Sequence, residues 1–507
     1  MAVGGGPGGA KVDDFAPFPI KDQLPGVDFC VSSAPSWPEA ILLGFQHYLV
    51  MLGTIVIISS VLVPLMGGGN VEKAEVINTL LFVAGISTML QTWFGSRLPV
   101  VIGGSYAFII PAISIALSKN NYSNFAFLSP HERFEESMRA IQGALIIASF
   151  FQMVIGFFGF WRIFARFLSP LAAVPLVTLT GLGLYGHGFP QLARCIEIGL
   201  PALIVVIVLS QYLPHMMKSR GAILNRYAVL FSVAVVWVYA EILTVAGAYE
   251  NKPPNTQISC RTDRSGLVSG APWIKFPYPF RWGRPTFDGG DVFAMMAACF
   301  VAVVEGIGTL LAGLYGTGIG LTASVENAGL LGLTRVGSRR VIEISAGFMF
   351  FFSVLGKFGA ILASIPLPIV AALYCVLFAY VASAGIGLLQ FCNLNSFRTK
   401  FILGFALFMG LSVPQYFNEY LLISGHGPFH THAIWFNNIM QVSFSSSATV
   451  AIIVAFFLDC TLSLSHSSTW RDSGRHWWGK FWKYDQDPRP EDFYSLPWNL
   501  NRFFPSF

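Results

Sequence analysis

The stretch from Ser324 to Arg335 places an acid, an amide and two glycines between long apolar segments. The acid is Glu326 and the amide beside it is Asn327. A carboxylate inside a membrane is costly unless a partner compensates it, so intramembrane ionisable groups are candidates for functional sites. Glycine lets the backbone leave the helical path and offer its own N–H and C=O groups to a ligand. The stretch therefore predicts a binding site for a small polar molecule that crosses a membrane.

Two other positions also place polar groups inside apolar runs. Gln46 and His47 are neighbours in the first long apolar segment, where they either bond to a partner helix or hold an acid of a site. The pattern favours neither alternative. Glu305 lies near the middle of a later apolar run, with Thr309 one helical turn further along the same face. A desolvated acid there can bind the donors of a ligand or carry a proton, unless a neighbouring helix satisfies it.

A Gly-Gly-Ser-Tyr run at 103–106 is flanked by Pro99 and Pro111 within another apolar segment. This pattern predicts a broken helix with an extended stretch at membrane depth, which is tolerated only where it is buried in protein or lines a cavity. Tyr106 and Phe108 would then stack on a planar ligand; the alternative is a kinked helix with packing aromatics. Together with the stretch at 324–335, the run gives one break in each half of the chain. Such a pair indicates an inverted-repeat transporter whose site lies where the breaks meet.

The composition identifies the kind of protein that holds these groups. Hydrophobic residues make up 54% of the 507 positions and charged residues only 11%, whereas soluble domains carry about 25% charged residues. Many apolar runs approach the roughly 20 residues that a helix needs to cross a bilayer. We therefore expect an all-α polytopic membrane protein. The net charge of +5 reflects asymmetry between loops, so no nucleic-acid partner is expected. The first residues lack the apolar region of a cleavable signal peptide.

Thirteen apolar segments follow a polar tail. They lie at about 39–66, 76–95, 97–118, 138–161, 164–187, 192–214, 226–248, 291–315, 320–334, 341–364, 366–388, 401–422 and 446–465. The long connection 249–290 is rich in Pro, Gly and aromatic residues and is expected to be an external loop.

The positive-inside rule places the N-terminus in the cytoplasm, together with the basic turns of the first half. The rule also places the cluster Arg335, Arg339 and Arg340 there. Counting crossings fails at this point, because a single crossing at 291–315 would put Arg339 and Arg340 outside. One crossing is therefore missing between Gly290 and Leu321.

Cysteine and histidine patterns give little support for a metal. The seven cysteines show no metal-ligand spacing, and neither a metal site nor a disulfide framework is predicted. His426, His430 and His432 share a loop that has no acidic partner, which disfavours a metal site. Asn121 begins an N-glycosylation sequon on an expected external turn.

The motif Glu326-Asn327-x-Gly329-x-x-x-x-Thr334-Arg335 resembles the signature motif of the nucleobase–ascorbate transporters, and Gln46-His47 resembles that family's first-span motif. The runs 334–340 and 493–497 resemble plant members in particular. The resemblance implies fourteen spans in two inverted repeats of seven, divided into a core and a gate domain, in a homodimer of the plasma membrane. It also implies secondary transport of nucleobases such as xanthine, uric acid and uracil, coupled to protons, with no enzymatic activity and no cofactor.

The resemblance also implies roles for individual residues. Glu305 matches the core-domain acid that binds the base edge. Glu326 matches a position that contacts the base and that is Pro in ascorbate carriers, so it favours a nucleobase. Tyr106 would pack on the ring, and Asn327 and His47 would order the site. The full expected substrate site is Ser105, Tyr106, Glu305, Ser324, Val325, Glu326 and Asn327. The supporting set is Gln46, His47, Thr309, Gly329, Thr334 and Arg335, with Glu305 and His47 in proton coupling.

The expected domain order follows from the resemblance and the apolar segments. Cytoplasmic tails occupy 1–36 and 466–507; the core domain takes 37–161 and 291–364; the gate domain takes 162–248 and 365–465; and 249–290 is the external loop.

One departure from the family is large. Only 21 positions separate Glu305 from Glu326, too few for the end of one helix, a loop and a further full helix at about 1.5 Å per residue. We infer an internal deletion of about one span. Either 291–318 forms a re-entrant hairpin that turns at Gly306 and Gly308, or it crosses once and the signature half is inverted.

The expected function is proton-coupled nucleobase symport. The alternatives are a transport-impaired deletion form of such a carrier and an ascorbate transporter. A channel would show rings of like charge, and an enzyme would show a nucleophile–base set. The sequence offers neither pattern.

Overall fold

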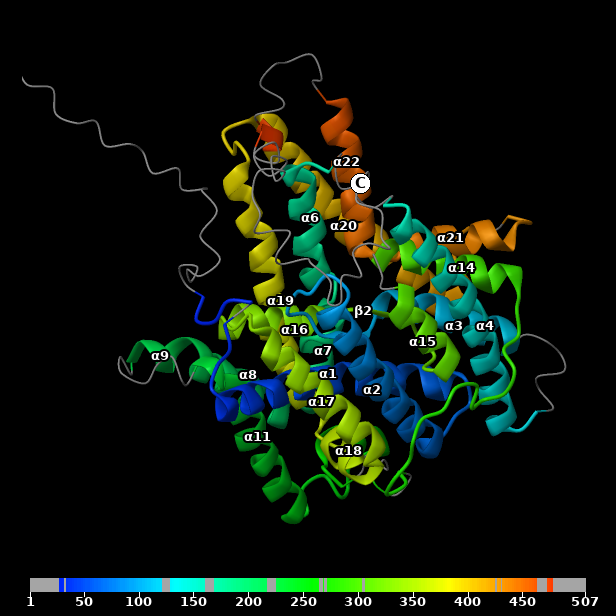
Figure 1. Ribbon diagram of the computed structural model, residues 1–507, viewed down its shortest axis with the longest axis vertical. Coiled ribbons are helices and arrows are strands. Elements are labelled where there is room, and N and C mark those ends of the chain that lie inside the picture. Colours follow the sequence, from blue (N-terminus) through cyan, green and yellow to red (C-terminus); the bar gives the residue numbers. More distant parts are fainter. Residues whose placement is uncertain are drawn as a thin grey trace, which may run out of the picture.

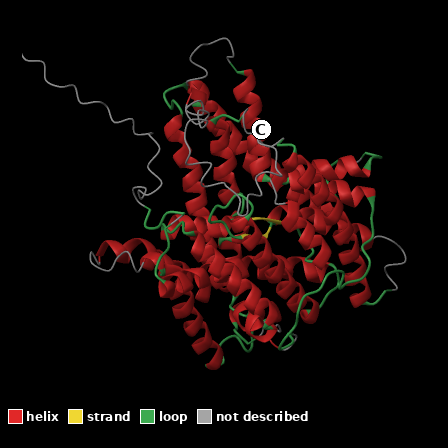
Figure 2. Cartoon of the chain, viewed as in Figure 1, coloured by secondary structure: helices red, strands yellow, loops and turns green. Residues whose placement is uncertain are grey.

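The computed structural model describes residues 27–31, 33–120, 128–159, 168–216, 225–263, 268, 271–302, 306–424, 426–429, 431–462 and 472–476. Within these residues helices and the loops that connect them make up the chain, apart from two short strands near the centre of the molecule (Figure 2). Glu305, Asn121 and His430 lie outside the described residues.

The elements form two sets of seven. The first set is α1 (Trp37–Leu65), α2 (Asn70–Trp93), β1 (Ile102–Gly104) with η1 (Tyr106–Phe108) and α3 (Ile109–Asn120), α4 (Pro130–Phe157), α6 (Pro170–Leu182), α8 (Ile196–Ile207) and α11 (Ala228–Val245). The second set is α14 (Gly289–Ala302), α15 (Gly306–Tyr315), β2 (Leu321–Ala323) with α16 (Val325–Thr334), α17 (Arg339–Val354), α19 (Leu367–Gly387), α20 (Phe397–Ser424) and α21 (Ile434–Phe444) with α22 (Ser447–Thr461). Shorter pieces are η3 (Tyr185–His187), α7 (Phe189–Leu192), η4 (Ala193–Cys195), η5 (Val208–Tyr212), α9 (Leu213–Met216), α12 (Pro254–Cys260), α18 (Gly356–Ala363) and η6 (Leu388–Phe391). The third member of each set begins with a strand, as expected for a seven-plus-seven inverted repeat.

The two predicted breaks meet at the centre of the fold. Strands β1 and β2 pair antiparallel, with Gly103 opposite Thr322 and Gly104 opposite Leu321. The pairing continues at one end, where the Ser324 N–H donates to the Val101 carbonyl at 2.9 Å. Because lipid offers no hydrogen bonds, an extended segment at membrane depth needs such a partner.

Fewer helices are long enough to span a membrane than the thirteen apolar runs suggest. Seven described helical stretches are long and apolar enough, or eight if the bent pair of α21 and α22 counts as one span. Three shorter apolar helices cover 106–117, 289–301 and 306–315. Two of these lie in the segment 291–315, which was predicted to be a single run.

Helices α14 and α15 are both too short to cross. They have 14 and 10 residues, or about 21 and 15 Å at 1.5 Å per residue, against a hydrocarbon core of about 30 Å. Both pack along α4. The three residues that connect them, 303–305, lie outside the described part of the chain.

Helix α14 runs in the same direction as α4. Just before it begins, the Thr286 N–H donates to the Arg139 carbonyl at 3.1 Å. Near its end, the ring of Phe300 lies 5.4 Å from that of Phe151. Residue numbers therefore rise together along the two helices.

Helix α15 runs against α4. Gly306 at its start lies beside Met153, and Gly313 near its end lies beside Ile146. The Gln142 side-chain amide donates to the Gly313 carbonyl at 3.1 Å. Since α14 runs with α4 and α15 against it, the pair forms a re-entrant hairpin.

The hairpin returns the chain to the side from which it came. The Gly337 N–H consequently donates to the Phe29 carbonyl at 2.8 Å, and the guanidinium of Arg340 lies 4.8 Å from the ring centroid of Trp37. The basic cluster therefore shares a face with the N-terminal segment, and the alternative of an inverted second half is wrong. Gly306 is the first residue of α15, and Gly308 lies inside that helix.

Two hydrophobic clusters organise the packing. The first joins α1, α2, α3, α4, α14 and α15 with part of α17, and the second joins α8, α11, α16 and α19 with another part of α1. Helices α6, α20 and α22 pack together, and α6 packs on α19 of the second cluster (Figure 1). The strand pair lies between these groups.

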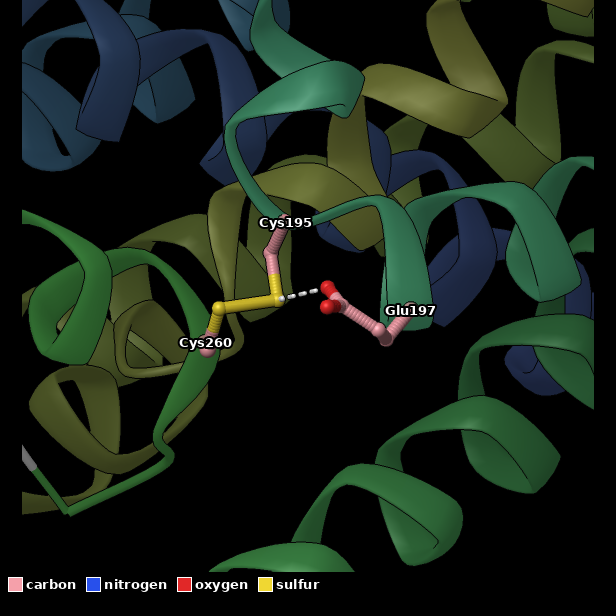
Figure 3. Close-up of side chains that lie close together, drawn as sticks. All are labelled: Cys195, Glu197 and Cys260. Atoms are coloured by element: carbon pink, nitrogen blue, oxygen red, sulfur yellow. Dashed lines mark hydrogen bonds between the residues drawn. A yellow bond between two sulfur atoms is a disulfide. The ribbon is translucent and has the colours of Figure 1, made fainter. Parts of the chain in front are cut away.

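A disulfide joins Cys195 at the start of α8 to Cys260 at the end of α12, with a Cα–Cα distance of 5.5 Å (Figure 3). The expectation of no disulfide was therefore wrong. The partners are 65 positions apart, and no spacing rule links them. Disulfides persist outside the reducing cytosol, which agrees with the expectation that the 249–290 connection is an external loop. Glu197 lies beside the bond, but sulfurs held in a disulfide offer no thiolate to a metal.

Besides the disulfide, side-chain contacts attach the 249–290 connection to α2 and to the end of α15. The carboxylate of Glu75 on α2 accepts two hydrogen bonds from Arg281, at 2.9 and 2.6 Å, and pairs with Lys275. The Trp282 indole donates to the Gly316 carbonyl at 3.0 Å, just after α15. This connection thus covers the external ends of α2 and α15.

Candidate substrate site

The start of α16 places the acid and the amide of the signature stretch. Strand β2 ends at Ala323, and Ser324 caps the helix by accepting a hydrogen bond from the Asn327 N–H at 3.3 Å. A serine at this position satisfies a backbone donor that the helix itself leaves unpaired. Glu326 and Asn327 therefore lie in the first helical turn, where each side chain is only 1% exposed.

A chain of hydrogen bonds joins these side chains to α1. His47 Nδ1 lies 2.8 Å from Asn327 Oδ1. Asn327 Nδ2 donates to Ser324 Oγ at 3.0 Å, and Ser324 Oγ donates to Glu326 Oε2 at 2.9 Å. Because the amide oxygen of Asn327 faces the imidazole, His47 Nδ1 carries the proton and donates. The network fixes the position of the carboxylate relative to α1.

The neighbouring Gln46 faces a different helix. Its side-chain amide donates to the Arg226 carbonyl at 3.1 Å, and its oxygen accepts from the Leu230 N–H at 3.4 Å. Both partners lie at the start of α11. The two neighbours therefore differ in their partners. Gln46 bonds to a partner helix, and His47 bonds to a residue of the candidate site.

The first broken span brings Tyr106 beside the carboxylate. The Tyr106 hydroxyl lies close enough to Glu326 and Thr54 for electrostatic interaction. Thr54 Oγ1 lies 2.7 Å from the hydroxyl of Tyr374 on α19. Ser105 caps the short helix η1 by accepting from the Ala107 N–H at 3.4 Å. Residues from α1, η1, α16 and α19 thus surround Glu326.

His187 adds a polar group that the sequence did not single out. Its ring centroid lies 4.5 Å from that of Tyr106, and it comes from η3, just beyond α6. A lone histidine in a Gly-rich turn has no spacing pattern, and only the fold brings it to Tyr106.

Three buried polar atoms in this region make no hydrogen bond of standard geometry with the described residues. They are Glu326 Oε1, the Tyr106 hydroxyl and His187 Nδ1. Buried polar atoms are normally satisfied, so such a group needs an explanation, and a polar ligand is one. The Glu326 carboxylate and the Tyr106 hydroxyl lie close enough to interact with each other, and the His187 ring lies close enough to interact with the Leu184 backbone. A ligand that binds here would replace these contacts with its own donors and acceptors.

The glycine of the motif serves helix packing. A Cβ at Gly329 would lie 2.3 Å from the Leu377 carbonyl oxygen of α19. Val325 packs on the same cluster of α19 residues. The motif therefore sets the distance between α16 and α19.

The remaining supporting residues hold the local backbone. Thr309 Oγ1 lies 3.4 Å from both the N–H and the carbonyl of Leu321, which ties α15 to β2. Thr334 donates to the Leu330 carbonyl at 2.8 Å. Arg335 ends the helix in the left-handed region, with φ of 59°. Among the hydrogen bonds that the structure describes, none joins these three residues to Glu326 Oε1, the Tyr106 hydroxyl or His187 Nδ1.

A polar site formed by two broken spans in a bundle of apolar helices defines a multi-pass membrane transporter rather than an enzyme. The profile of the Permease family matches residues 38–309 and 301–419. Nucleobase-ascorbate transporter 4 of Arabidopsis thaliana is 67% identical, over 98% of this chain and 99% of the relative. Nucleobase-ascorbate transporter LPE1 of Zea mays is 54% identical, over 98% and 99%. The chain therefore belongs to the permease family, as a plant-type nucleobase–ascorbate transporter.

Solved structures give more distant likenesses. One is described as the overall structure of SLC26A9, with a TM-score of 0.42 and 13% identity over 74% of this chain and 62% of that chain. Another is the murine Solute Carrier 26 family member A9 anion transporter in the inward-facing state. Its TM-score is 0.41 at 12% identity, over 82% and 68%.

The comparisons also show an irregularity at the hairpin. The two family matches overlap at 301–309, instead of forming one continuous match. The alignment with Nucleobase-ascorbate transporter 6 of Arabidopsis thaliana runs over 535 positions and covers 100% of the 507 residues. At least 28 of its positions therefore have no counterpart in this chain.

Proposed function

We propose that the site binds a purine or pyrimidine nucleobase for symport with protons. The single observation that carries this proposal is the buried Glu326 carboxylate beside the Tyr106 side chain, at the junction of the two broken spans. A nucleobase presents N–H donors on its edge and a flat π face. The carboxylate would accept from the edge, and the aromatic ring would stack on the face.

The helix packing supports a division of labour. Helices α1 to α4 and α14 to α17 form the core domain, and α6 to α11 and α19 to α22 form the gate domain. A base held by Glu326 and Tyr106 would contact the gate through His187. Movement of the core against the gate would then expose the site alternately to each side. Glu305 and His47 would take part in proton coupling.

Charge disfavours ascorbate as the substrate. Ascorbate is an anion near neutral pH, and it would have to approach the Glu326 carboxylate in a dry site where like charges repel strongly. The uncharged amide edges of a nucleobase avoid this penalty. The names of the relatives include both substrates.

The hairpin supports a second part of the proposal, which is that this chain lacks about one span and transports poorly. Its relatives have at least 28 more positions, and the family match breaks where α14 and α15 join. The chain retains the site residues of the first break and those of α16. We therefore propose that the chain binds its substrate and that its transport cycle is impaired.

Equilibrium binding separates these two statements. The purified protein should bind labelled xanthine, uric acid or uracil, and Glu326→Ala should weaken that binding at least about tenfold, or about 1.4 kcal/mol. Glu250→Ala, in an exposed loop, is the matched control and should change nothing. If the unaltered protein binds none of these bases but binds ascorbate, the substrate assignment is wrong.

His187 should also contribute to affinity. His187→Phe keeps an aromatic ring against Tyr106 but removes the ring nitrogen Nδ1. We therefore expect roughly tenfold weaker binding of the base and an unchanged melting temperature. His187→Asn restores a polar atom and should recover much of the affinity. His215→Phe, on exposed α9, is the control. Equal affinity of His187→Phe and the unaltered protein would remove His187 from the site.

A further inference from the structure

A second polar feature lies outside the candidate substrate site. A cavity of about 570 Å³ opens where the end of α2 meets the start of α17 and the segment before α1. Its charged lining residues are Arg97, Arg339, Arg340 and Glu343. The volume is in the range of small-molecule sites.

The charged lining is predominantly positive. The described lining residues include three arginines and one glutamate, and Glu343 Oε1 accepts a hydrogen bond from the Trp93 indole at 3.2 Å. Arg97 and Arg339 lie close enough to repel each other electrostatically. Glu343 also lies close enough to Arg339 to attract it. Guanidiniums recognise phosphate through paired hydrogen bonds.

The backbone at Arg97 is in an unusual conformation for this location. Its φ is 57°, in the left-handed region that costs a residue other than glycine roughly 1–2 kcal/mol. The Arg97 N–H donates to the Gln91 carbonyl at 3.2 Å, which holds the turn after α2. Strained residues of this kind cluster at ligand sites.

Tryptophans give the depth of the cavity in the bilayer. Trp93 lines the cavity and is 46% exposed. The Arg340 guanidinium lies over the ring of Trp37, which is 63% exposed. Exposed tryptophans at helix ends mark the headgroup layer of a membrane. The positive-inside rule places Arg339 and Arg340 in the cytoplasm, so the cavity opens at the cytoplasmic headgroup layer.

We propose that this cavity binds the phosphate-bearing headgroup of an anionic lipid of the cytoplasmic leaflet. Basic pockets between helices on this side of a membrane suit such headgroups. The N-terminal segment supplies Val31 and Ser33 to the lining, and Asp28 of the same segment pairs with Arg226 before α11 at 3.0 Å. A bound headgroup would therefore stabilise the segment on α17 and, through Asp28, its link to α11.

The test compares lipid compositions on the full chain. Nanodiscs of phosphatidylcholine with a few per cent of phosphatidylinositol 4-phosphate should raise the melting temperature by about 3 °C or more over phosphatidylcholine alone. The double variant Arg97→Gln/Arg339→Gln should lose this shift. Arg284→Gln, an exposed external arginine, should keep it. A parallel arm adds soluble inositol trisphosphate to the protein in pure phosphatidylcholine.

Each outcome decides the proposal. A lipid-dependent shift that only the double variant loses supports the site. No shift, or an equal shift in the double variant, overturns it. A shift with inositol trisphosphate as large as that with the lipid overturns the lipid assignment in favour of a soluble phosphate. Nucleobase binding does not enter these measurements, so the result is independent of the proposed transport function.

Discussion

Cells that express this chain with the missing segment restored between Glu305 and Gly306 should accumulate labelled nucleobase at a saturable rate, at least about tenfold above cells with the unaltered chain. The segment to insert is taken from Nucleobase-ascorbate transporter 4, which is 67% identical to this chain. The expectation rests on the lengths of α14 and α15, which have 14 and 10 residues where two crossings of about 20 residues each are needed.

The uncovered end of α4 gives the physical reason. The described part of the hairpin reaches to the level of Met153. Beyond it a Cβ at Gly156 would meet nothing within 4 Å, and Phe157 and Phe158 are 55% and 58% exposed. Two full helices would cover this end and extend the core domain to the cytoplasmic face. A core that moves as one body during transport needs that continuous packing.

The control for the restored chain is a Gly/Ser segment of equal length at the same position, which adds residues without an apolar helix. Immunoblots of surface protein normalise the uptake rates. We expect the Gly/Ser chain to remain at background. If the unaltered chain already transports as fast as the restored one, the proposed impairment is wrong.

Gly329→Ala should abolish base binding and lower the melting temperature of the purified protein by several degrees. A methyl group there would lie 2.3 Å from the Leu377 carbonyl oxygen, and a backbone atom cannot move aside as a flexible side chain does. Overpacking of this kind costs about 1–3 kcal/mol. The separation of α16 from α19 would also move Glu326 away from the residues of α19 that surround it.

Gly332→Ala provides the matched control on the same helix. Its Cβ would meet Tyr380 Cδ1 at 3.4 Å, an ordinary contact, and alanine is favoured over glycine in a helix by about 1 kcal/mol. We expect unchanged binding and equal or higher stability. Melting curves and equilibrium binding of both variants test the pair. If the two variants behave alike, the close contact between α16 and α19 is not required for base binding or stability.

The parts of the site predicted from the sequence share one property, which is a polar or Gly-rich interruption of an apolar run. Glu326, Asn327 and His47 were identified because such groups are costly in a membrane. The breaks at 103–106 and 324–335 were identified because glycine and proline interrupt helices locally. The structure brings both breaks together as β1 and β2.

The features that the sequence did not predict depend on contacts between distant positions. Cys195 and Cys260 meet only because α12 folds back on the start of α8. His187 reaches Tyr106 only because η3 lies beside the first break. The re-entrant hairpin was one of two alternatives, and packing along α4 rather than local composition selects it.

The pairing of β1 with β2 has a consequence for biogenesis. More than two hundred residues separate Gly104 from Leu321, so the ribosome completes β1 long before its partner strand exists. During that interval the 102–104 backbone lacks the partner strand that an extended segment needs in lipid. The first half of the protein therefore enters the membrane with an unpaired strand. Until β2 is made, this strand either stays at the translocation machinery or forms hydrogen bonds with a temporary partner.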